Sequence, residues 1–372
     1  MHPRSAHLRL AASVFLAALS LTSPLMAQTS SVWTGTAIGR KDTLWSAGKN
    51  WQGNAVPILG NHLTFLGPDV DNSNDLAADT SFSGLTFAAT AGAFDLTGNR
   101  IQLAGNLTNL SAAAQTVTLN LQLATPTSTF MTNIAGNLNV AGVISETGGA
   151  RSLSKAGLGT LTLSGANTFT GSTTVATAGG TLQLNTVDAL KNTSGIAVNT
   201  GGTLLLGGAG AVNRVNDSAG VTLSGGTLRI SGSSATSETL GVLTQTASST
   251  LDFGSGAGNQ LTFAGVGAHT PSASLSILNW SGTPRTAGTA TSDRLIFSGT
   301  ASSFTAAYAQ SDVSFSGFGT GYQAIQFEAD RYEIAAVPEP ATCFGALALV
   351  GLIGTRERRR LAAIWQSLRR SS

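Results

Sequence analysis

The sequence predicts an all-β chain folded as a parallel β-helix, in which short strands stack into a solenoid. Three observations lead to this fold class: a short repeat, alternation of apolar and polar residues within each copy, and a composition rich in Gly. The 372 residues include 45 Gly, and 42% are hydrophobic whereas only 10% are charged. That balance is typical of turn-rich β structure and argues against disorder, which requires low hydrophobicity or high charge.

The repeat is a five-residue strand pattern, usually beginning with Gly-Thr, that recurs five times. Its threonines follow one another at steps of 21, 22, 24 and 23 residues, at Thr160, Thr181, Thr203, Thr227 and Thr250. Within a copy, apolar residues such as Leu161 and Leu163 flank a polar one, so both apolar side chains point to the same face of a strand. Because one rung cannot bury that face alone, several rungs must stack.

Strand-like segments also lie on both sides of the repeat. The clearest before it are residues 85–87, 101–103 and 117–121, and those after it are 261–263, 275–278, 295–297 and a last strand at 327–334. We expect residues 28–150 to form an N-terminal β cap and the first rungs. Residues 151–336 are expected to continue as one solenoid domain, since no Pro-rich linker interrupts them.

Three tryptophans lie close together near the start of the body, namely Trp33, Trp45 and Trp51. They suit a cap that closes the open end of a solenoid, which needs a distinct terminal unit. Their ring faces also suit stacking on sugar rings. We favour the cap, and a sugar-binding platform is the alternative.

One stretch matches a known repeat nearly position for position. Residues 155–171 read KAGLGTLTLSGANTFTG, and the best copy extends to residue 182. This resembles the autotransporter-associated β-strand repeat. The resemblance implies a right-handed parallel β-helix on a surface-exposed bacterial protein, and the repeat brings no catalytic residues with it.

The first 27 residues have the three parts of a secretory signal peptide. Arg4 and Arg9 lie in a basic lead, residues 10–21 are apolar, and Ala27 is the small residue of a cleavage site. We therefore expect export by the Sec machinery. A membrane anchor that stays attached is the alternative.

The C-terminal segment 337–360 combines an extended motif, an apolar run and a basic cluster. The motif is Val337, Pro338, Glu339 and Pro340, and the basic cluster is Arg356, Arg358, Arg359 and Arg360. The apolar run 341–354 has 14 residues and would extend about 21 Å as a helix, less than the roughly 30 Å of a bilayer core. We expect a short membrane helix with its arginines on the cytoplasmic side; a buried core helix with a basic end is the alternative.

This order of features resembles the PEP-CTERM sorting signal of Gram-negative bacteria. The resemblance implies processing by the membrane enzyme exosortase, passage through the inner membrane, and release to the outer cell surface or the extracellular matrix. The chain departs from that family by continuing through residues 361–372, which we expect to form a basic amphipathic tail on an anionic membrane surface.

Charge and cysteine usage exclude several functions. Residues 28–336 carry 12 Lys and Arg against 16 Asp and Glu, a formal charge of −4, so the basic patch of a nucleic-acid-binding protein is missing. The lone cysteine, Cys343, lies in the C-terminal apolar run. The body therefore forms no disulfide and no Cys-ligated metal site.

Residues suited to catalysis are few. His62 and His269 are the histidines of the body, and neither lies in a recognisable motif. The acids of the best repeats, Asp188, Asp217, Glu238 and Asp252, are isolated in the sequence, whereas glycoside hydrolysis needs two facing carboxylates. We expect no enzymatic activity and no cofactor; a β-helical polysaccharide lyase or hydrolase is the alternative.

One acidic segment is a candidate calcium site. Asp69, Asp71, Ser73 and Asp75 place oxygen atoms at alternate positions, as a hard cation prefers. The bidentate Glu and the central Gly of an EF-hand loop are absent, and a solvated turn explains the segment equally well.

The sequence as a whole predicts an exported structural or adhesive protein of the cell surface or exopolysaccharide, whose extended Thr-, Ser- and Asn-rich face binds glycans or other cells. An autotransporter passenger would be followed by a C-terminal barrel of amphipathic strands. This chain is expected to end in a helix and arginines, so we favour the sorted protein.

Overall fold

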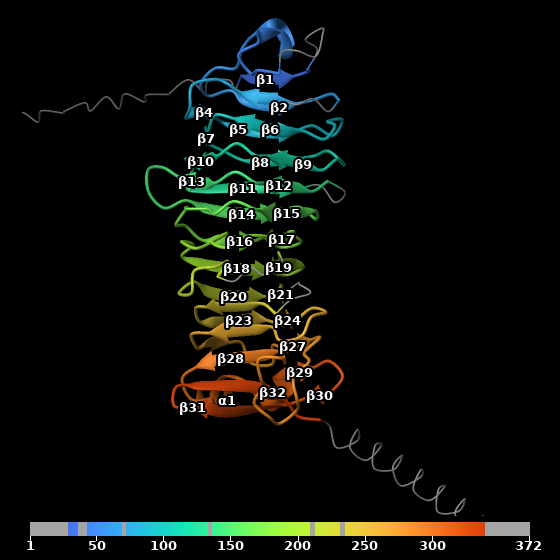
Figure 1. The fold of residues 1–372 in the computed structure, drawn as a ribbon, viewed down its shortest axis with the longest axis vertical. Coiled ribbons are helices and arrows are strands. Elements are labelled where there is room, and N and C mark those ends of the chain that lie inside the picture. The colour runs from blue at the N-terminus through green and yellow to red at the C-terminus, as the bar shows by residue number, and fades with distance from the viewer. Residues whose placement is uncertain are drawn as a thin grey trace, which may run out of the picture.

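A computed structural model describes residues 29–35, 43–68, 72–132, 136–208, 213–230 and 235–338. The described residues form an all-β solenoid whose rungs follow one another along the long axis, from the N-terminal blue end to the C-terminal red end (Figure 1). Their one α-helix is α1 (Ala301–Ala307). No helix among the described residues is long and apolar enough to cross a membrane.

Each rung contributes strands to two long sheets that run the length of the solenoid. The first long sheet has 11 strands in the order β1 (Ser30–Trp33), β2 (His62–Phe65), β5 (Gly84–Phe87), β8 (Leu107–Asn109), β11 (Thr127–Thr132), β14 (Ser152–Ala156), β16 (Thr173–Val175), β18 (Gly195–Asn199), β20 (Gly220–Ser224), β23 (Leu243–Ala247) and β26 (Val266–His269). The second has 12 strands: β3 (Asn72–Asn74), β6 (Asp95–Gly98), β9 (Gln115–Val117), β12 (Leu138–Val140), β15 (Thr160–Leu163), β17 (Gly180–Leu184), β19 (Gly202–Leu206), β21 (Thr227–Ile230), β24 (Ser249–Asp252), β27 (Leu275–Leu278), β29 (Val313–Phe315) and β30 (Gly319–Thr320).

A third face occupies the remaining side of each rung and is built in two pieces. The N-terminal piece has four strands: β4 (Thr80–Phe82), β7 (Ile101–Leu103), β10 (Leu121–Leu123) and β13 (Ile144–Glu146). The C-terminal piece has five, in the order β22 (Ser237–Leu240), β25 (Gln260–Phe263), β28 (Arg294–Ser298), β32 (Arg331–Ala336) and β31 (Tyr322–Glu328). Between the two pieces, a parallel bridge joins Leu190 to Val215.

The strand register confirms the repeat that the sequence predicts. Thr160 pairs with Thr181, and the same column continues in parallel through Thr203, Thr227 and Thr250. The leucine after each threonine is fully buried, at positions Leu161, Leu182, Leu204, Leu228 and Leu251. The apolar side chains therefore form one continuous core along the axis, as the alternation requires. The right-handed sense of the helix stays a prediction.

Two expected strands are wrong in detail. Residues 117–121 do not form one strand, because β9 ends at Val117 in the second long sheet and β10 begins at Leu121 on the third face. The backbone turns a corner between them, where the Asn120 side-chain oxygen accepts a 2.8 Å hydrogen bond from the Val143 N–H of the next rung. Residues 327–334 likewise span a hairpin, in which β31 and β32 pair antiparallel.

The two ends of the solenoid carry different short elements. The 3-10 helices η1 (Gly48–Asn50) and η2 (Gln52–Asn54) lie at the N-terminal end. At the C-terminal end, α1 and the 3-10 helix η3 (Gln310–Asp312) precede β29. Phe304 of α1 is fully buried, with its ring 4.5 Å from that of Tyr308 and 5.2 Å from that of Phe297. Aromatic packing therefore closes this end of the core.

Candidate functional site

The tryptophans form the closed N-terminal end of the core. Trp33, Trp45 and Trp51 are at most 1% exposed, and the Trp33 and Trp51 rings meet edge to face with centroids 5.1 Å apart. The indole N–H of Trp45 donates to the Asn72 side-chain oxygen at 2.9 Å, and that of Trp51 to the Trp45 carbonyl at 2.8 Å. Rings buried in this way have no free face, so the interpretation as a sugar-stacking platform is wrong and the capping interpretation holds.

Two residues of the acidic segment proposed to bind calcium, Asp69 and Asp71, lie outside the described residues. Asp75 is described, and both its carboxylate oxygens accept hydrogen bonds from Ser46. One of these bonds comes from the Ser46 backbone N–H at 2.8 Å. Ser73 belongs to β3, where its backbone pairs with Thr97 of β6. No group of three or more potential metal-binding His, Cys, Asp or Glu side chains occurs among the described residues.

The two histidines occupy structural positions at opposite ends of the first long sheet. His62 Nε2 lies 2.9 Å from the Thr86 hydroxyl of the next rung, and burial lowers the pKa of its imidazole. His269 Nε2 lies 2.8 Å from the Ala273 carbonyl, and its ring packs 4.1 Å from that of Tyr308. The structure does not bring the two histidines together.

The acids of the repeat region are held in separate contacts. Glu238 is fully buried and accepts hydrogen bonds from the backbone N–H groups of Arg214 and Val215 at 3.2 and 2.9 Å. The Arg214 guanidinium, also fully buried, lies 3.5 Å from the same carboxylate. Burial raises the pKa of Glu238 despite these contacts. Spacing in the sequence shows no such pair, because the two residues meet only when adjacent rungs stack.

The remaining three acids lie nearer the surface. Asp188 pairs with Lys191 at 3.3 Å, and Asp252 pairs with Arg229 on the neighbouring rung, also at 3.3 Å. The second Asp252 oxygen accepts the Gly254 N–H at 2.8 Å. Asp217 is exposed.

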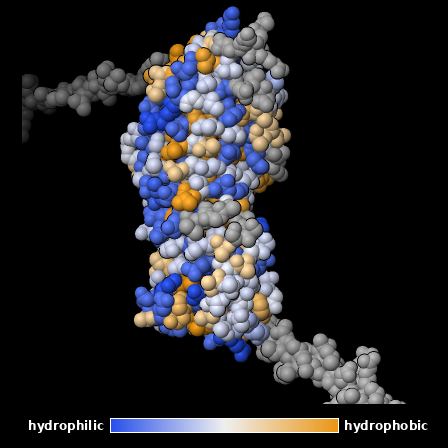
Figure 2. Space-filling model, viewed as in Figure 1, coloured by the Kyte–Doolittle hydropathy of each residue, from blue (hydrophilic) through white to orange (hydrophobic). Residues whose placement is uncertain are grey.

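The outward positions of the sheets are mostly hydroxyl and amide side chains, which stack into columns. One column on the third face runs through Ser81, Gln102, Gln122 and Ser145. Another, in the first long sheet, includes Ser154, Thr174 and Thr222. Figure 2 shows hydrophobic residues scattered in small groups over the visible face, among polar ones. The surface therefore presents repeated hydrogen-bonding groups with little charge.

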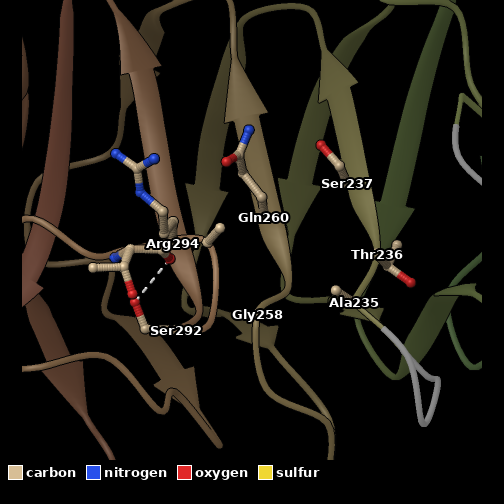
Figure 3. A pocket seen from close by; sticks show the side chains of 9 residues that line it. Ala235, Thr236, Ser237, Gly258, Gln260, Ser292 and Arg294 are labelled. Carbon is tan, nitrogen blue, oxygen red and sulfur yellow. Dashed lines mark hydrogen bonds between the residues drawn. The ribbon is translucent and has the colours of Figure 1, made fainter.

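A groove of about 230 Å³ opens on the C-terminal piece of the third face. Its lining comes from three successive rungs and one loop: Ala235, Thr236, Ser237, Gly258, Gln260, Thr289, Ala290, Ser292 and Arg294. Ser237, Gln260 and Arg294 are register partners on β22, β25 and β28, and their side chains stand side by side in Figure 3. This is the candidate site that the geometry supports best.

No motif in the sequence marks this groove. The one signal in the sequence is a longer spacing between register partners. Ser237 and Gln260 are 23 residues apart, whereas Gln260 and Arg294 are 34 apart. The longer step indicates an insertion between rungs, and residues 279–293 form part of it. The insertion supplies the Thr289, Ala290 and Ser292 wall of the groove.

Most residues of the sequence signals at the two ends lie outside the described residues. Ala27, Glu339, Pro340 and the basic cluster Arg356, Arg358, Arg359 and Arg360 lie outside the described residues, as does the tail 361–372. Val337 and Pro338 follow β32 directly. The signal peptide, the sorting motif and the membrane helix stay predictions.

Comparison with known proteins adds one family match. A model of the passenger-associated transport repeat matches residues 153–184, which run from β14 to the end of β17 and include the segment with the most regular sequence. No curated protein and no solved structure matches the chain. The match supports an autotransporter-associated β repeat within the solenoid, and such repeats suggest an exported, surface-exposed protein.

Proposed function

We propose that this protein is exported to the cell surface, where it acts as a structural or adhesive β-solenoid with no catalysis of its own. The observation that carries the proposal is the combination of a continuous buried core with outward columns of Ser, Thr and Gln, in a chain that contains a passenger-type repeat. A stacked core of this kind holds an elongated surface rigid without disulfides. That surface offers many hydrogen-bonding groups for glycans or for other cells.

The contacts of the two buried acids of the repeat region favour this function over a β-helical polysaccharide lyase or hydrolase. Glu238 is committed to the buried contact with Arg214, and Asp252 to Arg229 and a backbone N–H. A general acid or a nucleophile must instead have a carboxylate oxygen free to reach the substrate.

We further propose that exosortase processes the chain at its C-terminal motif, after Sec-dependent export and passage through the inner membrane. Support comes from the order of motif, apolar run and arginines in the sequence. It also comes from the position of Val337 and Pro338 immediately after the last strand. The motif therefore begins where the last strand of the body ends, and a cut there leaves all the described strands intact.

The test is the intact mass and cell fractionation of the native protein beside a Pro338→Ala/Pro340→Ala variant. We expect a mature form that begins near Gln28, lacks the residues after the motif and leaves the inner membrane, whereas the variant keeps its arginines. Pro271→Ala, in an exposed turn of the body, is the control and should be processed normally. Retention of the arginine tail in the native protein at the inner membrane would contradict the exosortase step.

A further inference from the structure

The groove on the third face presents hydrogen-bonding groups that the protein itself does not use. Among the described residues, neither the Ser237 hydroxyl nor the terminal guanidinium nitrogens of Arg294 have a hydrogen-bond partner. Gln260 donates one bond, 3.3 Å long, to the Thr262 hydroxyl of its own strand. The Arg294 guanidinium lies 4.8 Å from the centroid of the Phe327 ring, which holds its plane. The groove is therefore lined by donors and acceptors in a defined arrangement.

These groups follow a line parallel to the solenoid axis. Parallel strands lie about 4.8 Å apart, so three register partners on adjacent strands cover about 10 Å. Ser237, Gln260 and Arg294 stand in that order along the axis. A ligand that contacts all three must itself be extended and must offer hydrogen-bonding groups at intervals along its length, as the hydroxyl groups of a chain of sugar units do.

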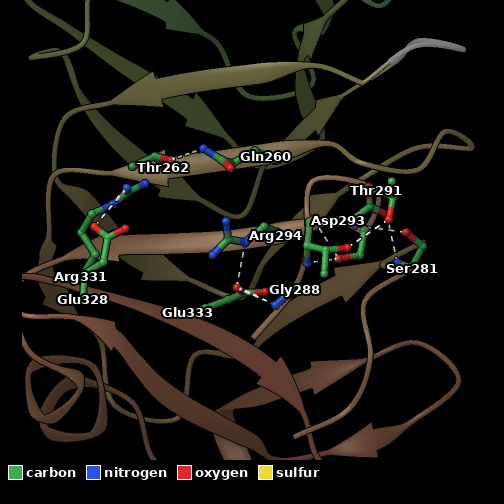
Figure 4. Close-up of polar contacts among 12 residues, drawn as sticks. Gln260, Thr262, Ser281, Gly288, Thr291, Asp293, Arg294, Glu328, Arg331 and Glu333 are labelled. Carbon is green, nitrogen blue, oxygen red and sulfur yellow. Dashed lines mark hydrogen bonds and ion pairs between the residues drawn. The ribbon is translucent and has the colours of Figure 1, made fainter. Parts of the chain in front are cut away.

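The positive charge of Arg294 is offset by a buried carboxylate, that of Glu333. Its Nε donates to the Glu333 carboxylate at 2.9 Å, and Glu333 is fully buried. The Gly288 N–H donates to the same Glu333 oxygen at 3.0 Å (Figure 4). Because a buried carboxylate compensates the guanidinium, Arg294 offers directed N–H groups with little net positive charge.

The loop that covers Glu333 is held by a second buried carboxylate. The Asp293 oxygens accept the backbone N–H groups of Asn259 at 2.8 Å and of Ser281 at 2.9 Å, so this carboxylate is not available to a ligand. Thr289 and Ser292 of the same loop line the wall of the groove, where the Ser292 hydroxyl donates to the Thr289 carbonyl at 3.1 Å. The lining thus combines hydroxyl, amide and guanidinium groups without an uncompensated charge.

We infer that this groove binds an uncharged glycan chain along the solenoid axis, with Ser237, Gln260 and Arg294 as its hydrogen-bonding row. The inference rests on the proposed surface function and names its ligand class. A polyanionic chain is disfavoured, because Glu333 offsets the single cation of the row and the body has a formal charge of −4.

The experiment is affinity electrophoresis of the full-length protein in gels that contain galactomannan, hydroxyethyl cellulose or alginate. We expect retardation by at least one of the two neutral polymers and little by anionic alginate. Gln260→Ala should weaken the apparent affinity roughly fivefold, since one hydrogen bond is lost. Gln183→Ala is the matched control: like Gln260, Gln183 donates one bond to the side chain two residues on, at 3.4 Å to Asn185, but it lies on β17 of the second long sheet, away from the groove.

Arg294→Ala would leave Glu333 buried and unpaired, so Ser237→Ala serves as the second variant, with thermal melting to show that both variants stay folded. Equal affinities for Gln260→Ala and Gln183→Ala, stronger retardation by alginate, or no retardation by any polymer would each overturn the inference. Surface exposure is scored separately, by protease accessibility on intact cells. A protein that is exposed on cells but does not bind overturns this inference alone, whereas one that binds in the gel but stays inside the cell overturns the proposed function.

Discussion

Buried polar side chains at the corners of the rungs hold adjacent turns of the chain together. Lys155 is the clearest example, because it is fully buried although it carries an ammonium group. Its Nζ donates to the carbonyls of Ala156 at 2.8 Å, Gly157 at 2.6 Å and Gly179 at 2.6 Å. The first two belong to its own rung and the third to the next. Lys155 therefore satisfies carbonyl groups at a corner where the sheets leave them unpaired.

Replacing Lys155 by Met keeps much of the side-chain volume but leaves those buried carbonyls without a donor. We expect the free energy of unfolding to fall by roughly 2–4 kcal/mol, measured by urea denaturation. Lys191→Met is the control, since Lys191 forms an exposed pair with Asp188, and it should change stability by less than about 1 kcal/mol. Equal effects of the two substitutions would contradict a structural role for Lys155.

Lys155 also makes stability depend on pH in the alkaline range. Burial lowers the pKa of its ammonium group to about 8, whereas an unfolded lysine titrates near roughly 10.4. Between these values the unfolded chain binds more protons than the folded one, so the contribution of Lys155 to the free energy of unfolding rises with pH.

The measurement is urea denaturation of the wild type and Lys155→Met at several pH values from 7 to 10. We expect the stability difference between them to be constant below about pH 8 and to grow above it. A difference that stays flat up to pH 10 would mean that the three carbonyls keep the group protonated.

At the scale of the element, corners between strands depend on glycines that no other residue can replace. Gly157 joins β14 to β15 with a φ of +76°, and a Cβ atom there would lie 2.1 Å from the Thr132 carbonyl oxygen of the preceding rung. The position is therefore restricted twice, by its backbone conformation and by the close approach of the preceding rung.

Gly157→Ala should lower the free energy of unfolding by more than about 3 kcal/mol, because strain and overlap add. Gly149→Ala separates the two causes, since Gly149 has a φ of +106° but nothing within 4 Å of a Cβ atom. That variant should lose only about 1–2 kcal/mol. The measurement is thermal or urea unfolding of both variants. Equal losses of unfolding free energy would show that the close approach of Thr132 plays no part at Gly157.

The whole molecule is a linear stack in which each rung contacts mainly its neighbours, so its stability depends on how the two ends are closed. The N-terminal end is closed by Trp33, Trp45 and Trp51, all buried. The C-terminal end is closed by antiparallel strands and aromatic side chains such as Phe304 and Tyr332, whose ring centroids are 6.4 Å apart. Opening of the stack should therefore begin at whichever closure is weakened.

Trp45→Ala should open the N-terminal rungs before the rest, because it removes a fully buried indole ring from the terminal cluster. Amide hydrogen exchange is expected to accelerate in β2 and β5, while β17 and β19 keep the protection of the wild type. Trp280→Ala is the mirror experiment, since Trp280 packs 5.0 Å from the Phe315 ring near the other end. It should accelerate exchange in β27 and β29 instead, and uniform acceleration by either variant would contradict a solenoid that opens from its ends.

The repeat, the column of threonines from Thr160 to Thr250 and the buried leucines beside them could all be predicted from the residues alone. These features are periodic and local, because alternation along a strand decides which side chains face inward. The break between Val117 and Leu121, the hairpin of β31 and β32, and the burial of the three tryptophans depend on how the chain packs in three dimensions. The same packing also decides the Arg214–Glu238 contact and the groove beside Arg294. The contact and the groove both join segments from different rungs. The fold of the intervening loop, rather than the spacing within a strand, sets which polar side chain of the next rung becomes the partner.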